Sequence, residues 1–560
     1  MEASGRTGVV RLFSVYQSLA RRQAWACASI FLLTLILRTA LLPWLPVPKP
    51  VIHDEFSYLL AGETYAHGRL ANPPHPFWQH FETFQELQQP AYMSKYQPMQ
   101  GLALALGKKL FEQPWIGVLL TTALASAAVC WMLQGWIDPE WALLGAFLFT
   151  LRVGVLSYWM NSYEGGSIPA IGGALALGAI ARIWRSREFG LAVIWAAGIS
   201  ILALSRPYDA AVLALSSAAV LAWHLSKSAR PRLSTAIPAL LVLSLTASAI
   251  AYNDYRVTGH AFTLPYQAHD RQYAVATMFS FIPLHPEPMY RHALMREFWA
   301  GWDVDLWKDS HSQLLAQFLA KAFSLSDFFF GFWPIALPLL LWPSTVKSPE
   351  EKVCAGLLAV CLLALAPLVS VLPHYAAAFS GVFYLRFLQS LKHVGAWKRP
   401  LGPIFAAAIP VLFVFAFLNS TAGLMRGGND PVPFAAGRDS FSTVLAERAS
   451  RFGAARDAMD RDLAVLPGKQ LVLVHYQTAH NPQEEWVYNH ADIDSSRVVW
   501  AREMGPAEDA PFLAYFHDRR VWLAEPDATP LRLIPYSAKE PTLAMKIVAM
   551  KAVAMKESSR

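Results

Sequence analysis

The chain has 560 residues, of which 54% are hydrophobic and only 16% are charged. Soluble domains carry about 25% charged residues, and here the apolar residues form long runs, so the composition indicates a polytopic membrane protein and excludes a wholly soluble one. The formal net charge is +7, but the basic residues lie in short segments between apolar runs, which argues against a nucleic-acid partner. The four cysteines lie inside apolar runs and predict neither a disulfide framework nor a zinc site.

Eleven apolar runs are long enough to cross a bilayer, which takes about 20 residues. The predicted spans are 24–44, 115–135, 140–158, 167–184, 189–205, 210–226, 234–252, 326–343, 353–372, 375–391 and 401–420. With this count the Lys and Arg clusters of the connections fall on one side, as the positive-inside rule expects. The sequence thus predicts a cytoplasmic N-terminus (1–23) and a transmembrane domain (24–420). It also predicts extracytoplasmic loops 45–112 and 253–325 and an extracytoplasmic tail (421–560).

The first loop places His53, Asp54 and Glu55 side by side, shortly after the first span. Residues 54–70 predict a helix that begins near Asp54 and ends in the region of Gly68. One interpretation is structural: Asp54 caps free N–H groups and Glu55 favours the positive end of the helix dipole. The other is that two costly carboxylates at a membrane surface do chemistry on a lipid-borne substrate.

Later in the same loop, Lys95 precedes an amphipathic helix that Pro98 initiates and that is apolar enough to lie along the membrane surface. A lone Lys at such a place is often an anchor that extends towards the interface. The alternative is that its ammonium group faces a lipid phosphate.

Several motifs resemble the GT-C superfamily of membrane glycosyltransferases, in particular the protein O-mannosyltransferase family and its bacterial aminoarabinose-transferase branch. The motifs are HDEFSYL (53–59), SKYQP (94–98), SYWMNSYEGG (157–166), SRPYD (205–209), PHYAAAF (373–379) and EEWVYNHADID (484–494). Better-known members carry two prolines after the Lys and its neighbour, and here Gln97 occupies the first of those places.

The resemblance implies a GT-C-like fold of about 11 transmembrane helices in a bacterial inner membrane. It also implies transfer of a sugar from a polyprenyl-phosphate donor to an unidentified extracytoplasmic acceptor, with inversion at the anomeric carbon. Asp54 matches the proposed general base of such enzymes, and Glu55 would assist by orienting the acceptor or holding a metal.

Transfer from a lipid phosphate also needs cations that stabilise the leaving group. The candidates are Lys95, Arg206 and Arg152. Asp209 could simply neutralise Arg206, and Arg152 could be paired structurally within its span.

Further polar groups fall at the predicted outer ends of the spans. The candidate substrate-binding residues are His53, Tyr96, Tyr163, Glu164, Tyr208, Asp209, His374 and Tyr375. Glu164 could equally be an ordinary loop residue, and His374 an interfacial histidine with its polar atoms satisfied. A divalent metal on His53, His80, Glu82 and Glu164 is left open, because no spacing requires it.

The middle loop carries many Tyr, His and Trp residues and could cover the site as a lid. In the tail, segments 469–476, 496–503 and 520–526 predict strands, 512–519 predicts a helix, and NPQEEWVYNH could form a short one. The tail is therefore expected to be a small α/β domain. Asp492 and Asp494 are interpreted as turn residues.

Two alternatives to an enzyme stay open. A transporter or flippase of lipid-linked glycans would place polar groups near mid-membrane and show two related halves. No internal repeat is convincing, and the polar groups gather at the outer ends of spans. The other alternative is a GT-C-like scaffold without activity.

Overall fold

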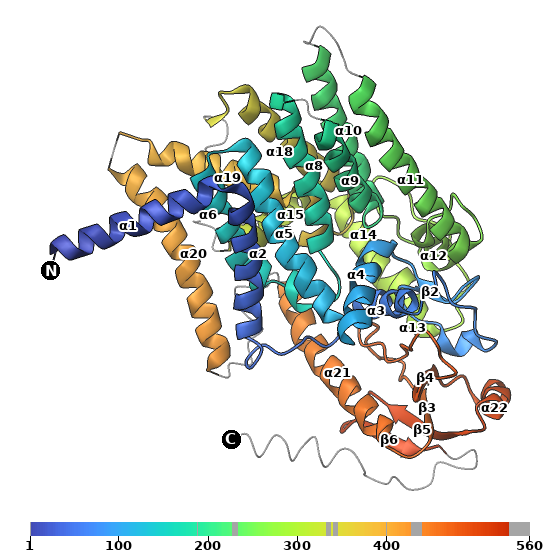
Figure 1. Cartoon of the computed structure of the whole chain (residues 1–560). Coiled ribbons are helices and arrows are strands. Elements are labelled where there is room, and N and C mark those ends of the chain that lie inside the picture. The colour runs from blue at the N-terminus through green and yellow to red at the C-terminus, as the bar shows by residue number, and fades with distance from the viewer. Residues whose placement is uncertain are drawn as a thin grey trace.

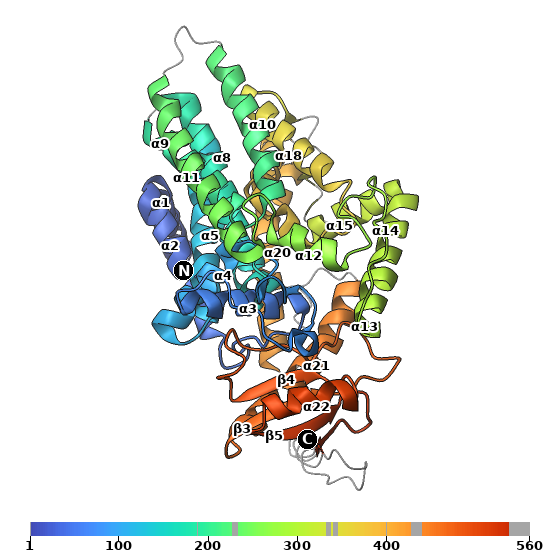
Figure 2. The same ribbon diagram turned by 90° about the vertical axis from the view of Figure 1, so that its right-hand side faces the viewer.

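The computed structural model describes residues 2–186, 189–226, 233–331, 336, 338–339, 345–398, 400–426 and 440–536. A large helical bundle occupies most of the molecule, and a small sheet domain lies at one end of it (Figures 1 and 2). Two short helices of the first loop, α3 (His53–Ala66) and α4 (Pro98–Phe111), lie between these two parts.

The bundle contains α1 (Glu2–Arg21), which precedes the first apolar run, and the helices that follow the apolar runs. The latter are α2 (Gln23–Ala40), α5 (Trp115–Trp136), α6 (Pro139–Phe149), α7 (Tyr158–Asn161), α8 (Ser167–Ser186), α9 (Phe189–Ala203), α10 (Pro207–Ser226), α11 (Leu233–Thr258), α15 (Leu314–Phe330), α18 (Pro349–Leu365), α19 (Ser380–Gly395) and α20 (Leu401–Met425). A π-helical turn, Thr150–Val155, continues α6, and a 3-10 turn, Pro373–Phe379, precedes α19.

Five helices of the described residues are long and apolar enough to cross a membrane. They are Gln23–Ala40, Trp115–Trp136, Ser167–Arg185, Ala236–Thr258 and Leu401–Met425. Two further predicted spans coincide with shorter apolar helices, Gly190–Ala203 and Pro207–Trp223. The predicted span 326–343 extends over residues outside the described ones. The full count of eleven and the orientation of the termini therefore stay predictions.

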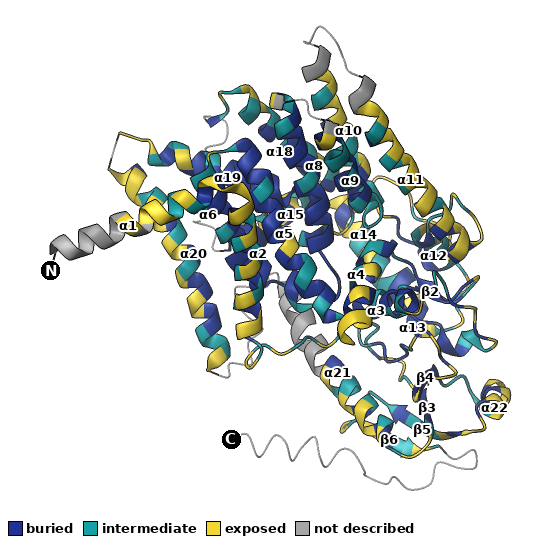
Figure 3. Cartoon of the chain, viewed as in Figure 1, coloured by how far each residue is buried: buried dark blue, intermediate teal, exposed yellow. Residues whose placement is uncertain are grey.

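The outer helices carry many exposed residues (Figure 3), and several of these are large and apolar. Leu245 of α11 is 72% exposed and Val411 of α20 is 65% exposed, whereas the aromatic residues at the C-terminal end of α15 are fully buried. Continuous apolar faces of this kind are unfavourable in water and are typical of contact with lipid. The helices thus indicate a membrane protein.

The helix predicted after Asp54 is confirmed as α3 and ends just before Gly68, whose φ is 73°. The helix predicted after Pro98 is confirmed as α4. The two pack closely, since a Cβ added at Gly101 would lie 2.7 Å from that of Ala61. Between them, β1 (Glu86–Leu87) and β2 (Met93–Ser94) form an antiparallel pair.

The middle loop also folds into short helices. They are α12 (Pro265–Tyr273), α13 (Ala293–Arg296), a π-helical turn (Glu297–Trp302) and α14 (Asp303–Ser312). Aromatic residues of this loop pack against Phe84 of the first loop, so the two loops form one folded layer at the end of the bundle.

The tail contains the predicted α/β domain. Its elements are α21 (Ser440–Ala464), β3 (Lys469–Val474), β4 (Val498–Arg502), α22 (Pro506–Tyr515), β5 (Arg519–Glu525) and β6 (Arg532–Pro535). The strand order is β4-β3-β5-β6, with β3 parallel to β4 and β5, and β6 antiparallel to β5. The short helix considered for NPQEEWVYNH is not formed, because residues 485–490 have no regular secondary structure.

The sheet has an apolar residue at every position of its central strand from Leu471 to Val474, as a strand covered on both faces requires. Val472 and Val474 pack towards α21, whereas Leu471 and Leu473 pack towards α22 and Phe81 of the first loop. The first loop therefore completes the core of the tail domain. This shared core joins the domain to the layer that carries α3.

Candidate functional site

Asp54 is the second residue of α3, and its carboxylate accepts a hydrogen bond from the Tyr96 hydroxyl. The charges of Lys95 and Arg206 also act on it. Burial raises the pKa of Asp54 above its ordinary value, and the Tyr96 hydrogen bond and the two cations oppose this shift. Asp54 is therefore a carboxylate held between a hydroxyl and two cations.

Glu55 has a different environment, although it is the next residue. Its Oε2 atom accepts the backbone N–H groups of Val51 (2.8 Å) and Ile52 (3.2 Å). Its Oε1 atom accepts that of Tyr163 (3.0 Å), in the segment between α7 and α8. Burial raises the pKa of Glu55 to about 7. The carboxylate thus ties the start of α3 to a distant segment of the bundle.

Lys95 follows β2 and is only 3% exposed. Its ammonium nitrogen lies 4.4 Å from the ring centroid of Tyr266, 5.2 Å from that of Trp299 and 5.6 Å from that of Tyr96. Burial lowers the pKa of Lys95. The carboxylates that act on its charge are Asp270, Asp54 and Asp303. No acidic side chain of the described residues lies within ion-pair distance of Lys95, so an aromatic cage holds a cation without a direct counterion.

Arg206 precedes α10, and its Nε atom donates to Asp209 at 2.7 Å. Its guanidinium carbon lies 4.1 Å from the ring centroid of Tyr375. Within the described part of the chain, its two terminal nitrogens donate to no protein acceptor. Asp209 therefore neutralises part of the charge, as the structural interpretation expected, and two donors are left for a ligand.

Glu164 and His374 come together from distant parts of the sequence. Glu164 Oε2 lies 3.8 Å from His374 Nδ1, which also contacts the Tyr158 hydroxyl at 2.8 Å. Glu164 is buried, its pKa is raised by that burial, and it interacts electrostatically with Asp54. These polar groups therefore converge on the side of Asp54 and Arg206.

Three of the predicted site residues form hydrogen bonds with parts of the protein away from Asp54. The Arg152 guanidinium donates to the carbonyl oxygens of Phe328 (2.8 Å) and Asp327 (2.6 Å) at the end of α15. His53 Nδ1 contacts the Tyr488 hydroxyl of the tail domain at 2.7 Å.

The Tyr208 hydroxyl donates to the carbonyl oxygen of Ala364 at 2.7 Å. The Tyr163 hydroxyl donates to the carbonyl oxygen of Pro48 at 3.1 Å. The structure therefore gives Arg152, His53 and Tyr208 protein partners away from Asp54, and it places Tyr163 at the site through its backbone.

The four residues considered for a metal do not meet. His80 contacts Asp509 at 3.2 Å, and Glu82 accepts from Tyr273 at 2.9 Å. Glu164 lies beside His374, and His53 faces the tail. Throughout the described residues, no three His, Cys, Asp or Glu side chains gather as a set that could hold a metal ion.

Sequence reasoning missed Tyr58, whose ring stacks on Tyr96 with centroids 4.5 Å apart. Its signal was available, because Tyr58 follows Asp54 by four residues and therefore lies on the same face of a helix. Asp270 and Asp303 were also missed as neighbours of Lys95, since only the fold brings the middle loop to the first loop.

The comparisons with known proteins found similarity at the level of structure. No protein-family model and no curated protein sequence matches the chain. The ArnT protein of Cupriavidus metallidurans bound to undecaprenyl phosphate is 13% identical over 93% of this chain and 95% of that chain, with a TM-score of 0.48. The oligosaccharyltransferase of Archaeoglobus fulgidus in complex with zinc and sulfate is 13% identical over 89% of this chain and 67% of that chain, with a TM-score of 0.46.

Sequence identity to both proteins is 13%, and no residue role is carried from them to this chain.

Proposed function

We propose that this protein is a membrane glycosyltransferase that moves a sugar from a polyprenyl-phosphate donor to an acceptor hydroxyl outside the cytoplasm. The observation that carries the proposal is the grouping around Tyr96: its hydroxyl donates to Asp54, and the Lys95 ammonium nitrogen lies 5.6 Å from its ring centroid. The charge of Arg206 acts on the same carboxylate. Each cation has capacity for a further anionic partner.

In this proposal Asp54 is the general base. It takes the proton of the acceptor hydroxyl while the oxygen forms a bond to the anomeric carbon. The bond from that carbon to the phosphate oxygen breaks, and the electron pair leaves with the phosphate. Attack from the face opposite the leaving group inverts the anomeric centre.

Lys95 and Arg206 would bind the donor phosphate. Negative charge grows on this group as the sugar leaves, and cations held in a site with little water stabilise it strongly. Tyr266, Trp299 and Tyr375 hold the two cations in place through their ring faces. The prenyl chain would lie in the lipid against the exposed apolar helices.

The contacts of Glu55 support a positioning role in place of the direct assistance expected from the sequence. Three backbone N–H groups already occupy its carboxylate, so its task in the proposal is to hold α3 and the 162–166 segment together.

The experiment that tests this function is Asp54→Asn in membranes supplied with labelled polyprenyl-phosphate sugars. Loss of a general base lowers transfer by about 10²- to 10⁴-fold. Asp518→Asn is the matched control, because that carboxylate is exposed in the tail and pairs with Lys469 of the same domain. Unchanged transfer by Asp54→Asn would eliminate Asp54 as the base. Failure of the wild-type protein with every donor would favour the scaffold interpretation.

A further inference from the structure

Two faces of helix α3 contact different parts of the molecule. Asp54 and Tyr58 lie on the side of Tyr96 and Arg206. His53, Phe56 and Glu63 lie along another face, at the spacings of three and seven residues that place side chains on one side of a helix. This second face contacts the tail domain.

The contacts on the second face are direct and mostly buried. The ring of Phe56 stacks on that of Tyr488 with centroids 4.2 Å apart and an interplanar angle of 2°. The Tyr488 hydroxyl also contacts His53 Nδ1 at 2.7 Å. Near the other end of α3, Glu63 Oε2 lies 3.0 Å from His490 Nδ1 and accepts the backbone N–H of Ala491 at 2.9 Å. The tail thus holds α3 at both ends.

The tail residues in these contacts belong to one segment without regular secondary structure, residues 486–491, which is the docking segment. Two side chains of the tail fix its backbone. Arg456 of α21 donates to the carbonyl of Tyr488 at 2.7 Å, and Asn489 donates to that of Trp500 in β4 at 2.7 Å. The docking segment is therefore anchored to the sheet domain and cannot shift independently of it.

We propose that the docking segment positions Asp54 by holding the opposite face of α3, so that Tyr488 and His490 are positioning residues for the transfer reaction. This inference rests on the proposed function, because it concerns the same base. It assigns the tail domain a part in the reaction geometry. Small displacements of a reacting group are costly, and about 1 Å of misplacement can lower a rate about 100-fold.

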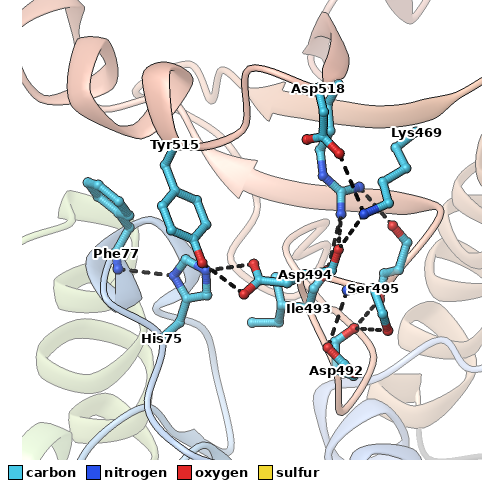
Figure 4. A network of polar contacts seen from close by, with 11 residues as sticks. His75, Phe77, Lys469, Asp492, Ile493, Asp494, Ser495, Tyr515 and Asp518 are labelled. Atoms are coloured by element: carbon cyan, nitrogen blue, oxygen red, sulfur yellow. Dashed lines mark hydrogen bonds and ion pairs between the residues drawn. The ribbon is translucent and has the colours of Figure 1, made fainter.

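A contact elsewhere in the same interface provides a matched control. His75 of the first loop lies 3.1 Å from Asp494 of the tail, and Tyr515 donates to the same carboxylate at 2.9 Å. Figure 4 shows both side chains directed at Asp494. This His–carboxylate pair resembles His490–Glu63 in distance, but it includes no residue of α3.

The experiment compares Tyr488→Ala, Tyr488→Phe, Glu63→Gln and Asp494→Asn in the full-length protein. Two quantities are measured: hydrogen exchange of the backbone amides of residues 53–66, and kcat and KM for transfer. Tyr488→Ala is expected to speed exchange in α3 and to lower kcat about tenfold or more, with KM for the donor within about twofold. Tyr488→Phe keeps the stacked ring, so its exchange rates in α3 and its kcat should be close to those of the wild-type protein.

Glu63→Gln should change exchange and kcat in the same direction as Tyr488→Ala but to a smaller extent. If Tyr488→Ala does not fold, Glu63→Gln provides the test. Asp494→Asn should leave both quantities near the wild-type values. Unchanged exchange in α3 of Tyr488→Ala and Glu63→Gln would overturn the inference. So would faster exchange with an unaltered kcat, or equal effects of Asp494→Asn.

The two measurements separate this inference from the proposed function. If the wild-type protein transfers no sugar, the proposed function fails, and the exchange result alone decides whether the docking segment holds α3. If transfer occurs and exchange is unchanged, the proposed function stands and the positioning role is wrong.

Discussion

At the scale of single residues, two neighbouring carboxylates differ because their hydrogen-bond partners differ. Glu55 accepts three backbone N–H groups, which leaves its oxygens little capacity for a substrate. Burial raises the pKa of Asp54, and the Tyr96 hydrogen bond and two cations oppose this shift. Within the described residues Asp54 has only one side-chain hydrogen bond, so it can accept more. Adjacent acids in the sequence therefore need not act as a pair.

The surroundings of Asp54 predict how transfer depends on pH. A base must be deprotonated, so kcat/KM falls as the pH drops through the pKa of Asp54, which burial raises above 3.8. The Tyr96 hydrogen bond lowers this pKa. Tyr96→Phe should therefore move the acidic limb of the profile to higher pH. A limb that stays in place or moves to lower pH would show that another group controls it.

Because Lys95 lies in an aromatic cage without a direct counterion among the described residues, we expect its replacement to weaken binding of the donor. A hydrogen bond to a charged group contributes about 1.5–3 kcal/mol, so Lys95→Ala should weaken binding of a labelled polyprenyl phosphate about 10- to 100-fold. Lys109→Ala is the control, because this Lys is exposed at the end of α4. Equal affinities of the two variants would remove Lys95 from the phosphate site.

At the scale of elements, the distance between Asp54 and Lys95 depends on how α3 packs against α4. Gly101 of α4 leaves room for Ala61 and Tyr65 of α3: an added Cβ would lie 2.7 Å from the Ala61 Cβ and 2.8 Å from a ring carbon of Tyr65. A close approach of two helices fixes their spacing to within a fraction of an ångström. The glycine thus sets the geometry of both site residues.

Gly101→Ala should push the two helices apart and lower the free energy of unfolding by about 1–3 kcal/mol, the usual cost of overpacking. Gly356→Ala in α18 is the matched control, because nothing lies within 4 Å of a Cβ added there, and Ala favours a helix by about 0.5–1 kcal/mol. Unfolding of the detergent-solubilised protein measures both. Equal stabilities of the two variants would show that α3 and α4 can separate without cost.

The ion pair between α3 and the docking segment predicts a window of pH. His490 and its neighbours lower the pKa of Glu63 to about 2, so this stabilisation is complete above about 4.5 and disappears as the pH falls towards 2. Glu63 raises the pKa of His490, so that contribution is complete below 6.5 and disappears as the pH rises through the raised pKa.

The difference in melting temperature between wild type and Glu63→Gln should therefore be greatest between about pH 4.5 and 6.5. Its size should be small, because the His490 side chain is 64% exposed and solvent screens the pair. Asp460, Arg456 and Lys108 also act on the two groups and do not change the signs. A difference that is constant from pH 3 to 9 would contradict the assignment.

At the scale of the whole molecule, the sequence predicts elements better than contacts. The strand predicted at 469–476 depends on local composition, and the structure contains it as Lys469–Val474. Seven of the predicted apolar spans likewise coincide with apolar helices of the described residues. The surroundings of Asp54 come from α3, the segment before α4, the start of α10 and the 373–379 turn. Helix topology predicts that these segments meet at one end of the bundle, so their proximity can be inferred from the sequence alone.

Individual partners are not predictable in this way. The acceptors of Arg152 are backbone carbonyls about 175 residues away, and every residue has a carbonyl, so no residue type signals them. His53 likewise pairs with Tyr488, 435 residues later. The sequence predicts both as site residues because ionisable groups in or beside a membrane span are costly and usually serve a function. Here the structure gives each of them at least one protein partner.

Asp54 must lie on the same side of the membrane as the tail domain. The shared core of the first loop and the sheet domain keeps them at the same end of the bundle. A single measurement on the tail therefore locates the site. In intact cells, a membrane-impermeant maleimide should label Ser495→Cys, an exposed position of the tail, because the sequence predicts that the tail is extracytoplasmic.

Lys398→Cys, also exposed, is the matched control. It precedes α20, which spans about 37 Å and whose other end points towards the tail (Figure 1). It should react only after the membrane is permeabilised, because its Lys is one of the basic residues predicted to face the cytoplasm. Labelling of Lys398→Cys in intact cells and of Ser495→Cys only after permeabilisation would place Asp54 in the cytoplasm. Transfer to an extracytoplasmic acceptor would then be physically excluded, whatever the activity of the purified protein.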